Sequence, residues 1–310
     1  MTSQNILAAH SRIKNYVKQT PILTSSSINK MTGGHLFFKC ENLQKVGAFK
    51  ARGAFNFLLQ LSHVDLANGV VTHSSGNHAQ ALALAAKTLG TKAYIVMPDN
   101  APTIKVAAVK EYGAEITFCE PNLAAREKTM LEIQKNTKAI FVPPYNHKWI
   151  IEGQATSALE LLKELQDLDI IIAPVGGGGL LSGTCLANYY FGKAQVFGAE
   201  PEGADDAFRS LKQNKRVEHH TPTTIADGLL TTLGPLTFEI MNQHVTDILT
   251  VNDHEIIHAM RVIWERMKII VEPSSAVALA AVLKNPALFR NKKTGLILSG
   301  GNVDLNKLPF

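Results

Sequence analysis

The stretch "GVVTHSSGNHAQALALAAKTLGTKAYIVM", residues 69–97, contains two short apolar segments separated by a longer segment with helical spacing. Residues 69–73 and 92–97 are rich in β-branched side chains and have the length of strands. Residues 78–90 have an apolar face at helical spacing and end on Gly90, a common C-terminal cap. A strand, a helix and a second strand in this order form a βαβ unit with parallel strands. The stretch therefore predicts an α/β fold.

The same alternation continues along the chain in two series. The first series has further strands at residues 114–119 and 138–142, and helices at 101–113 (ending on Gly113) and 123–137. The segment "VPPYNHK" then interrupts the pattern. The second series has strands at residues 169–176, 194–201, 245–251 and 294–301, and helices at 153–166 and 254–268. We therefore expect two open parallel-sheet lobes, a small domain at 69–146 and a large discontinuous domain at 1–68 and 147–310.

The composition is that of an ordinary globular protein. The 310 residues are 45% hydrophobic and 18% charged, and the basic residues behind the net charge of +5 are scattered, which disfavours nucleic-acid binding. The three cysteines, Cys40, Cys119 and Cys185, are too far apart for a Cys-x-x-Cys pair and fit a reducing compartment. No apolar run reaches the roughly 18 residues of a membrane span, and the N-terminus lacks the pattern of a secretory signal. The sequence thus predicts a soluble, cytoplasmic protein without a membrane partner.

A run of four glycines follows one of the expected strands and precedes a helix in "APVGGGGLLSGTCLANYY". Glycines allow close approach to the backbone N–H groups, and a helix N-terminus favours negative charge, so this turn suits a phosphate. A dinucleotide site is the alternative, with Glu200 at the end of the next strand as the ribose-binding acid. The Gly-x-Gly-x-x-Gly spacing fails, however, because Leu181 or Ser182 stands where the third glycine belongs.

Two more turns and one lysine complete a candidate site. The turn "SSGNH" leads from a strand into a helix and offers hydroxyl, amide and backbone donors suited to a carboxylate, although Ser and Asn could also be plain N-caps. Ser299 ends the last strand in "LILSGGNVD". Lys50, in "KVGAFKARGA", could be a surface charge on an amphipathic helix together with Arg52. A lysine, a phosphate site and a carboxylate site together favour Schiff-base chemistry on a phosphorylated aldehyde cofactor.

Five motifs occur in the order in which one enzyme family has them: "GAFKARGA", "SSGNHAQ", "PVGGGGLLSG", "EPEGADD" and "LSGGNVD". Over nearly its whole length the chain resembles the serine/threonine dehydratase and serine racemase family of pyridoxal-phosphate enzymes. The resemblance implies PLP fold type II, which is tryptophan-synthase-β-like, and a homodimer. It also implies pyridoxal 5'-phosphate as cofactor and a small β-hydroxy amino acid as substrate.

The resemblance assigns roles to individual residues. Lys50 would hold the cofactor as a Schiff base, Phe49 would lie beside the pyridine ring, Asn77 would meet its phenolic oxygen, and Ser299 its nitrogen. The phosphate would be bound by Gly176, Gly177, Gly178 and Gly179. The substrate carboxylate would be received by Ser74, Ser75 and Asn77, with Arg126 near the substrate. Ser75 would face Lys50 across the substrate Cα as a second acid/base.

The resemblance also implies a metal site and a nucleotide site. Glu200, the Ala204 carbonyl and Asp206 would bind Mg²⁺, Ca²⁺ or Mn²⁺, whereas by itself "EPEGADD" indicates only an acidic, exposed loop. ATP would bind as an effector between subunits. Its residues would be Lys45, Gln80, Tyr112, Lys268 and Asn302, although Val46 departs from the threonine of animal serine racemase and Tyr145 from its asparagine.

The predicted reaction is elimination of water from L-serine, L-threonine or a similar β-hydroxy amino acid to give a 2-oxo acid and ammonia. Arg126 could pair with a second carboxylate, which makes 3-hydroxyaspartate an alternative substrate. Serine racemase as the primary activity is a second alternative. Two alternatives from other classes of protein stay open: a nicotinamide-dependent dehydrogenase and a catalytically silent metabolite-binding protein.

Overall fold

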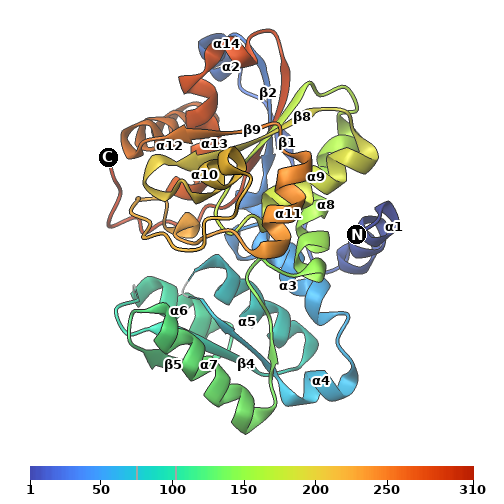
Figure 1. Cartoon of the computed structure of the whole chain (residues 1–310), viewed down its shortest axis with the longest axis vertical. Coiled ribbons are helices and arrows are strands. Elements are labelled where there is room, and N and C mark those ends of the chain that lie inside the picture. The colour runs from blue at the N-terminus through green and yellow to red at the C-terminus, as the bar shows by residue number, and fades with distance from the viewer. Residues whose placement is uncertain (75, 102) are drawn as a thin grey trace.

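The computed structural model describes residues 1–74, 76–101 and 103–310, and it divides into two lobes, each built on its own sheet (Figure 1). The lower lobe in this view contains a four-stranded sheet in the order β5-β4-β3-β6, with every neighbouring pair parallel. Its strands are β3 (Val70–His73), β4 (Ala93–Pro98), β5 (Glu115–Cys119) and β6 (Ile140–Phe141). Its helices are α4 (His63–Asn68), α5 (Asn77–Leu89), α6 (Thr103–Glu111) and α7 (Leu123–Thr137).

Burial and capping explain why the first βαβ unit forms here. Val70 and Val71 of β3 are fully buried, and α5 presents a run of buried alanines to the sheet side of the lobe. Gly90 adopts a left-handed conformation (φ 70°), and its N–H donates to the carbonyls of Ala86 and Lys87, so α5 ends where the glycine predicts.

The upper lobe contains a six-stranded sheet in the order β1-β2-β10-β7-β8-β9. Only β1 is antiparallel to its neighbour. The strands are β1 (Ile22–Leu23), β2 (His35–Cys40), β7 (Ile170–Pro174), β8 (Gln195–Pro201), β9 (Asp247–Val251) and β10 (Lys293–Leu298). With two open, largely parallel sheets, the predicted α/β fold class is confirmed.

Two apolar cores cover the two faces of the large sheet. One core involves α2 (Ser26–Thr32), α12 (Asp253–Met267), α13 (Pro273–Lys284) and α14 (Pro286–Phe289). The other involves α1 (Ser3–Ile13), α8 (Lys148–Glu164), α9 (Gly179–Phe191), α10 (Asp206–Gln213) and α11 (Pro235–His244). The helix α3 (Lys50–Leu58) packs against both α8 of the upper lobe and α5 of the lower lobe, so it joins the two.

The sequence pattern did not predict β1 and β2. β1 has two residues, too few for a periodic signal, and β2 carries a lysine in its interior. Lys39 is completely buried, and its Nζ donates to Glu160 Oε2 at 2.6 Å and to the Thr20 carbonyl at 2.7 Å. The charge is therefore compensated inside the protein.

Arg52 corrects the reading of α3 as a helix with a solvated polar side. Its side chain is 0% exposed, and its guanidinium hydrogen-bonds the carboxylates of Glu41 and Glu160 at 2.7–2.8 Å. We call Lys39, Glu41, Arg52 and Glu160 the buried ion network; it contains two positive and two negative side chains. The network connects β2, the residues that follow β2, α3 and α8. Its member Arg52 lies two residues after Lys50 in α3.

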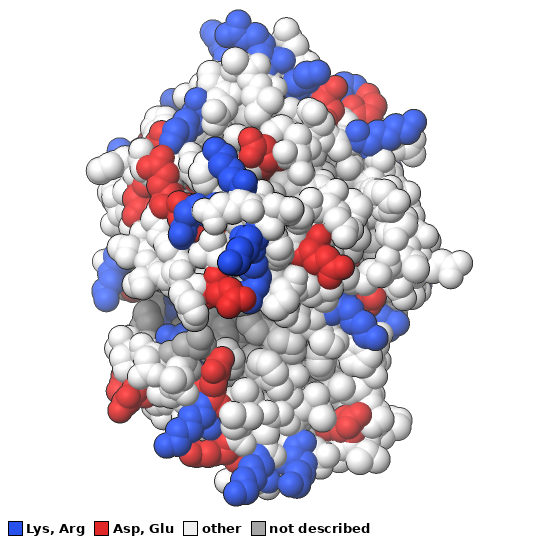
Figure 2. All heavy atoms as spheres, in the orientation of Figure 1, with Lys and Arg blue, Asp and Glu red and all other residues white. Residues whose placement is uncertain are grey.

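The surface agrees with the scattered charge of the sequence. On the face shown in Figure 2, basic and acidic side chains are interspersed, without a large patch of one sign. No helix in the described part of the chain is long and apolar enough to cross a membrane. All three cysteines are free thiols.

Candidate active site

Lys50 lies at the start of α3, between the two lobes. Its Nζ donates a 2.8 Å hydrogen bond to the carbonyl of Pro144 and lies 5.1 Å from the centre of the Phe49 ring. Burial lowers the pKa of Lys50 to about 8, and the nearby Glu272 carboxylate acts in the opposite direction. Roughly a tenth of this amine is therefore neutral at pH 7, far more than for an ordinary lysine, and the neutral form is the one that acts as a nucleophile or base.

The backbone fixes the Lys50 segment to the turn that follows β10. The N–H of Phe49 donates to the Ser299 carbonyl at 3.0 Å, and the N–H of Gly301 donates to the Gly47 carbonyl at 2.9 Å. Ser299 is 3% exposed. Two of the quoted motifs, about 250 residues apart, thus form one structural unit.

Asn77, at the first turn of α5, is held by two polar partners. Its Nδ2 donates to Glu272 Oε1 at 2.9 Å, and its Oδ1 accepts from Asn302 Nδ2 at 2.9 Å. Asn302 also donates its backbone N–H to Glu272 Oε2. Burial, with a contribution from Asp227, raises the pKa of Glu272 to about 8. These hydrogen bonds connect the lower lobe to the end of the upper sheet and fix the orientation of the Asn77 amide.

The four glycines form the turn between β7 and the N-terminus of α9, where the sequence placed them. A Cβ atom at Gly177 would lie 2.3 Å from Cδ1 of Tyr145, so no larger residue fits there. The Thr231 hydroxyl donates to the Tyr145 phenol oxygen at 2.9 Å. Tyr145 directly follows Pro144, the acceptor for Lys50, so the lysine and the glycine turn contact the same short segment.

The expected substrate loop begins at Ser74, after β3. Ser74 Oγ accepts a hydrogen bond from the Gly76 N–H at 3.4 Å. Ser75, the expected second acid/base, lies outside the described residues. Arg126 on α7 has a buried Nε without a hydrogen-bond partner among the described residues, and its charge helps to lower the pKa of His73, after the larger effect of burial. Arg126 is therefore near the residue that precedes this loop.

Part of the loop "EPEGADD" is buried although its composition indicates exposure, whereas Glu202 and Gly203 are exposed. Glu200 and Asp206 are both 0% exposed, and Ala204 is 1% exposed. The Glu200 oxygens accept the N–H groups of Ala207 and Phe208, and Asp206 Oδ2 accepts the N–H of Leu233. Asp206 Oδ1 has no partner among the described residues.

The two buried carboxyl groups of this loop, those of Glu200 and Asp206, are hard to ionise. Burial raises the pKa of Glu200 well above its ordinary value, with Asp206 adding to the effect, and burial raises the pKa of Asp206 to about 6. No group of three or more His, Cys, Asp or Glu side chains suited to a metal occurs among the described residues. A cation here would need the Ala204 carbonyl and water to complete its ligands.

The residues expected to bind ATP come from several elements of the chain. Asn302 Nδ2 donates to the Val46 carbonyl, and Lys45 Nζ lies 5.7 Å from the Phe55 ring centre. Gln80 is buried in α5, Tyr112 follows α6, and Lys268 caps α12 in the other lobe. The nucleotide site between subunits stays a prediction.

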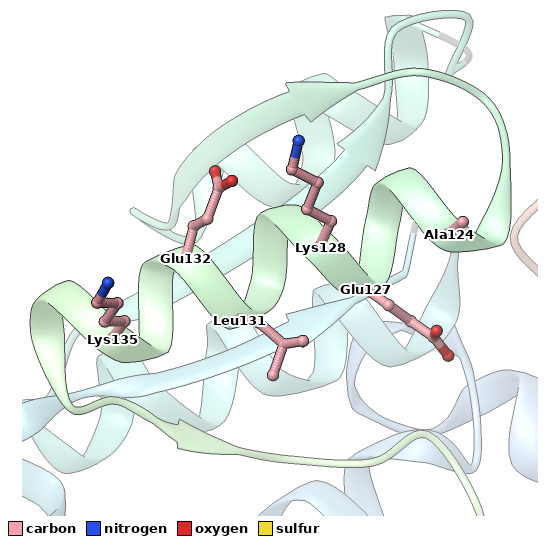
Figure 3. Close-up of a pocket in the computed structure, with 6 residues that line it drawn as sticks. All are labelled: Ala124, Glu127, Lys128, Leu131, Glu132 and Lys135. Carbon is pink, nitrogen blue, oxygen red and sulfur yellow. The ribbon is translucent and has the colours of Figure 1, made fainter.

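A hollow of about 430 Å³ lies along α7, lined by Ala124, Glu127, Lys128, Leu131, Glu132 and Lys135. Figure 3 shows these side chains projecting from successive turns of this one helix. Leu131 is 58% exposed among charged neighbours, as on an ordinary solvated helix face. This hollow is not part of the site around Lys50.

A family model described as "Pyridoxal-phosphate dependent enzyme" matches residues 13–300. The chain belongs to this family. The family match gives the chain pyridoxal phosphate chemistry, and we set aside the dehydrogenase alternative.

Two relatives of this pyridoxal-phosphate enzyme are similar over their whole length. A β-hydroxyaspartate dehydratase from Paracoccus denitrificans is 49% identical and covers 100% of this chain and 98% of its own. A serine racemase from Dictyostelium discoideum is 48% identical, over 99% of this chain and 97% of its own. The crystal structure of the Dictyostelium enzyme has a TM-score of 0.94 and covers 98% of this chain and 99% of that one. Dehydratases and racemases of amino acids are therefore the activities to compare.

The residues present fit the cofactor. The glycine turn, closed to larger side chains and placed at a helix N-terminus, suits the phosphate. Lys50 has a lowered pKa and Asn77 a fixed amide, and the Ser299 side chain is buried at the end of β10.

Sequence reasoning missed Glu272 and the packing of Tyr145. Glu272 precedes Pro273 at the start of α13 and resembles any acidic residue at a helix N-terminus. Its proximity to Lys50 and its bonds to Asn77 depend on tertiary packing between residues 195 positions apart. For Tyr145 the sequence shows only a difference from animal serine racemase, and no local pattern indicates its contact with Gly177.

Proposed function

We propose that this enzyme eliminates water from β-hydroxy amino acids and that 3-hydroxyaspartate fits its site better than serine or threonine. The observation that carries the proposal concerns Arg126, which lies near the loop after β3. Its buried guanidinium Nε has no hydrogen-bond partner among the described residues. A second substrate carboxylate would supply the missing partner and form a charge-assisted pair. The 49% identity to a β-hydroxyaspartate dehydratase supports this choice.

The residues have separate tasks in this reaction. The bound cofactor supplies an electron-withdrawing ring that acidifies the Cα–H bond of the amino acid. The neutral Lys50 amine takes the Cα proton, which its lowered pKa permits. Asn77 and the glycine turn hold the cofactor, and Glu272 fixes the Asn77 amide. Ser74 and Asn77 receive the substrate α-carboxylate.

The test is a substrate panel of D- and L-serine, D- and L-threonine and the isomers of 3-hydroxyaspartate, measuring the oxo acid and the inverted amino acid. We expect an isomer of 3-hydroxyaspartate to have the highest kcat/KM. Arg126→Gln should lower its kcat/KM by roughly 10- to 100-fold, from the loss of one charged pair, and change that of L-serine much less. Equal losses for both substrates would contradict the role of Arg126 in binding a second carboxylate.

Serine racemase activity is the second candidate, favoured by the 48% identity to a serine racemase. Racemisation needs a proton donor on the face of Cα opposite Lys50, and Ser75 is proposed for that role. Ser75→Ala should then remove the interconversion of serine enantiomers and deuterium incorporation at Cα of D-serine, while elimination of the L-substrate through Lys50 persists. Interconversion at the wild-type rate would leave Ser75 as a binding residue only.

We also propose that Glu200, Asp206 and the Ala204 carbonyl bind Mg²⁺ or a similar divalent cation. The unpartnered Asp206 oxygen and the proximity of two buried carboxylates support a missing positive charge. The site contacts the cofactor region through Leu233. The N–H of Leu233 donates to Asp206, and a Cβ atom at Gly178 would lie 2.9 Å from the Leu233 side chain.

Chelation should lower the melting temperature by about 5 °C, and added Mg²⁺ should restore it, if the site is near saturation. Asp206→Asn should abolish this response, whereas Asp205→Asn, which removes the ion pair with Arg209 and a charge near Glu200 but no proposed ligand, should keep it. Because burial raises the pKa values of both Glu200 and Asp206, that of Asp206 to about 6, protons compete with the cation, and the Mg²⁺ effect should weaken as the pH falls and be lost below about 6. If chelator in metal-free buffer leaves the melting temperature unchanged, the site is ruled out.

A further inference from the structure

His78 is a buried histidine in the first turn of α5, directly after Asn77, and it is 2% exposed. Its Nε2 lies 3.0 Å from the carbonyl oxygen of Val142, whereas its Nδ1 has no hydrogen-bond partner among the described residues. A carbonyl oxygen can only accept, so Nε2 carries the ring proton and Nδ1 is left as an acceptor. A buried acceptor without a partner next to a cofactor-binding residue calls for an explanation.

The segment that holds the His78 ring also holds Lys50. Val142 follows β6, and its N–H donates to the Val71 carbonyl of β3 at 2.9 Å, so the sheet fixes its position. Two residues later, the Pro144 carbonyl accepts the hydrogen bond of Lys50 Nζ. Burial and, after it, the nearby charge of Lys50 lower the pKa of His78 to about 3, while the bond to Val142 acts in the opposite direction. The imidazole is therefore uncharged at neutral pH, and its Nδ1 stays able to accept.

Lys50 needs acceptors once it has taken the Cα proton. Its ammonium group then has three N–H donors in a buried place, and among the described residues only the Pro144 carbonyl accepts from it. The oxygens of Glu272 already accept from Asn77 and Asn302. Burial raises the pKa of Glu272 to about 8, so this carboxyl group is largely uncharged at pH 7. A further acceptor would remove the cost of buried, unpaired N–H groups.

We propose that His78 is a positioning residue whose Nδ1 accepts a hydrogen bond from the Lys50 ammonium group, directly or through one water molecule. This bond stabilises the protonated amine between removal of the Cα proton and the next step. His73 also acts on His78, but burial lowers the pKa of His73 too, so it brings no positive charge at neutral pH. The inference rests on the proposed role of Lys50 as the Cα base, and it holds whether elimination or racemisation follows.

Two substitutions separate the roles of the two ring nitrogens. Glutamine is long enough to place an amide N–H where Nε2 lies, so His78→Gln keeps a donor for Val142 and loses the acceptor at Nδ1. Asparagine is shorter and places a carbonyl oxygen near Nδ1, so His78→Asn keeps the acceptor and loses the bond to Val142. His63→Gln, at an exposed histidine of α4, is the control.

The measurement is kcat of the holoenzyme for Cα-deuterated L-serine across pH, counting oxo acid and D-serine together, because removal of the Cα deuteron begins either reaction. On the acid limb, kcat falls as Lys50 becomes protonated. Loss of an acceptor disfavours the ammonium form and lowers the pKa of Lys50, so the acid limb should move about one pH unit lower in His78→Gln. His78→Asn and His63→Gln should keep the wild-type limb. The melting temperature should fall more in His78→Asn than in His78→Gln, since only the former loses the bond to Val142.

An acid limb that stays in place in His78→Gln, or that moves equally in both His78 variants, would overturn the inference. Loss of the visible cofactor band in His78→Gln would overturn it as well, because Nδ1 would then serve the cofactor site and not Lys50. Consumption of L-serine by Lys50→Ala at the wild-type rate is a separate outcome, which contradicts the proposed function.

Discussion

Lys50→Ala is expected to lower turnover of every substrate in the panel by at least about 10³-fold, because no other described group supplies both the nucleophile and the Cα base. The amine donates to Pro144 and has a pKa lowered to about 8 by burial, so it is prepared for this work. The variant should remain folded, because removing a partly desolvated cation removes its desolvation cost together with its hydrogen bond to Pro144.

The decisive measurement is peptide mapping after borohydride reduction of the wild-type holoenzyme, which should label Lys50. Lys87→Ala, an exposed lysine on α5, is the control and should keep its activity and its visible absorption band. Labelling of a different lysine would show that the assignment is wrong.

Arg52→Met should lower the free energy of unfolding by about 3–5 kcal/mol, the usual effect of removing one partner of a buried ion pair. The guanidinium hydrogen-bonds Glu41 and Glu160, and its loss leaves two buried carboxylates with only Lys39 to balance them. Urea unfolding measures the change. Lys92→Gln, which removes an ion pair with Glu115 that is 70% and 59% exposed, should cost less than about 1 kcal/mol.

The pH dependence gives a second readout for Arg52. Burial alone would raise the pKa of Glu41, but the charge and hydrogen bonds of Arg52 hold it below the ordinary value of 4.5. The stability from this pair is therefore present above pH 4.5 and lost as the pH falls through the lowered pKa. The difference between wild type and Arg52→Met should shrink in that acidic range. A difference under about 1 kcal/mol at neutral pH would contradict a stabilising role of the network.

Local sequence predicted the parallel sheets because their strands are apolar and their helices carry clear caps. Residues 70–73 and 93–98 lie within one residue of the expected strands, and Gly90 ends α5 as expected. The motifs also placed the turns that carry Lys50, Asn77 and the four glycines, since each turn lies next to a strand or a helix that the pattern identifies.

Burial of charge could not be predicted in the same way. Arg52, Glu200 and Asp206 have sequence neighbours that indicate exposure, yet all three are 0% exposed. Glu200 is satisfied by N–H groups only seven and eight residues along the chain, whereas Asp206 and Arg52 have partners in more distant segments. Glu160, the partner of Arg52, is 108 residues away along the chain. Periodicity reports which face of an element is apolar, but a compensated charge inside the protein leaves no periodic signal.

The position of β10 has a consequence for how the chain folds. β10, at residues Lys293–Leu298, lies between β2 and β7 in the middle of the upper sheet. During synthesis the four strands of the lower sheet are complete by residue 141, whereas β2, paired until then only with the two-residue β1, can join the rest of the upper sheet only after β10 is made. Such long-range pairing slows folding, so we expect the lower lobe to acquire structure first on the ribosome. A nascent chain lacking β10 should show protease resistance in the lower lobe while its upper lobe is still cleaved.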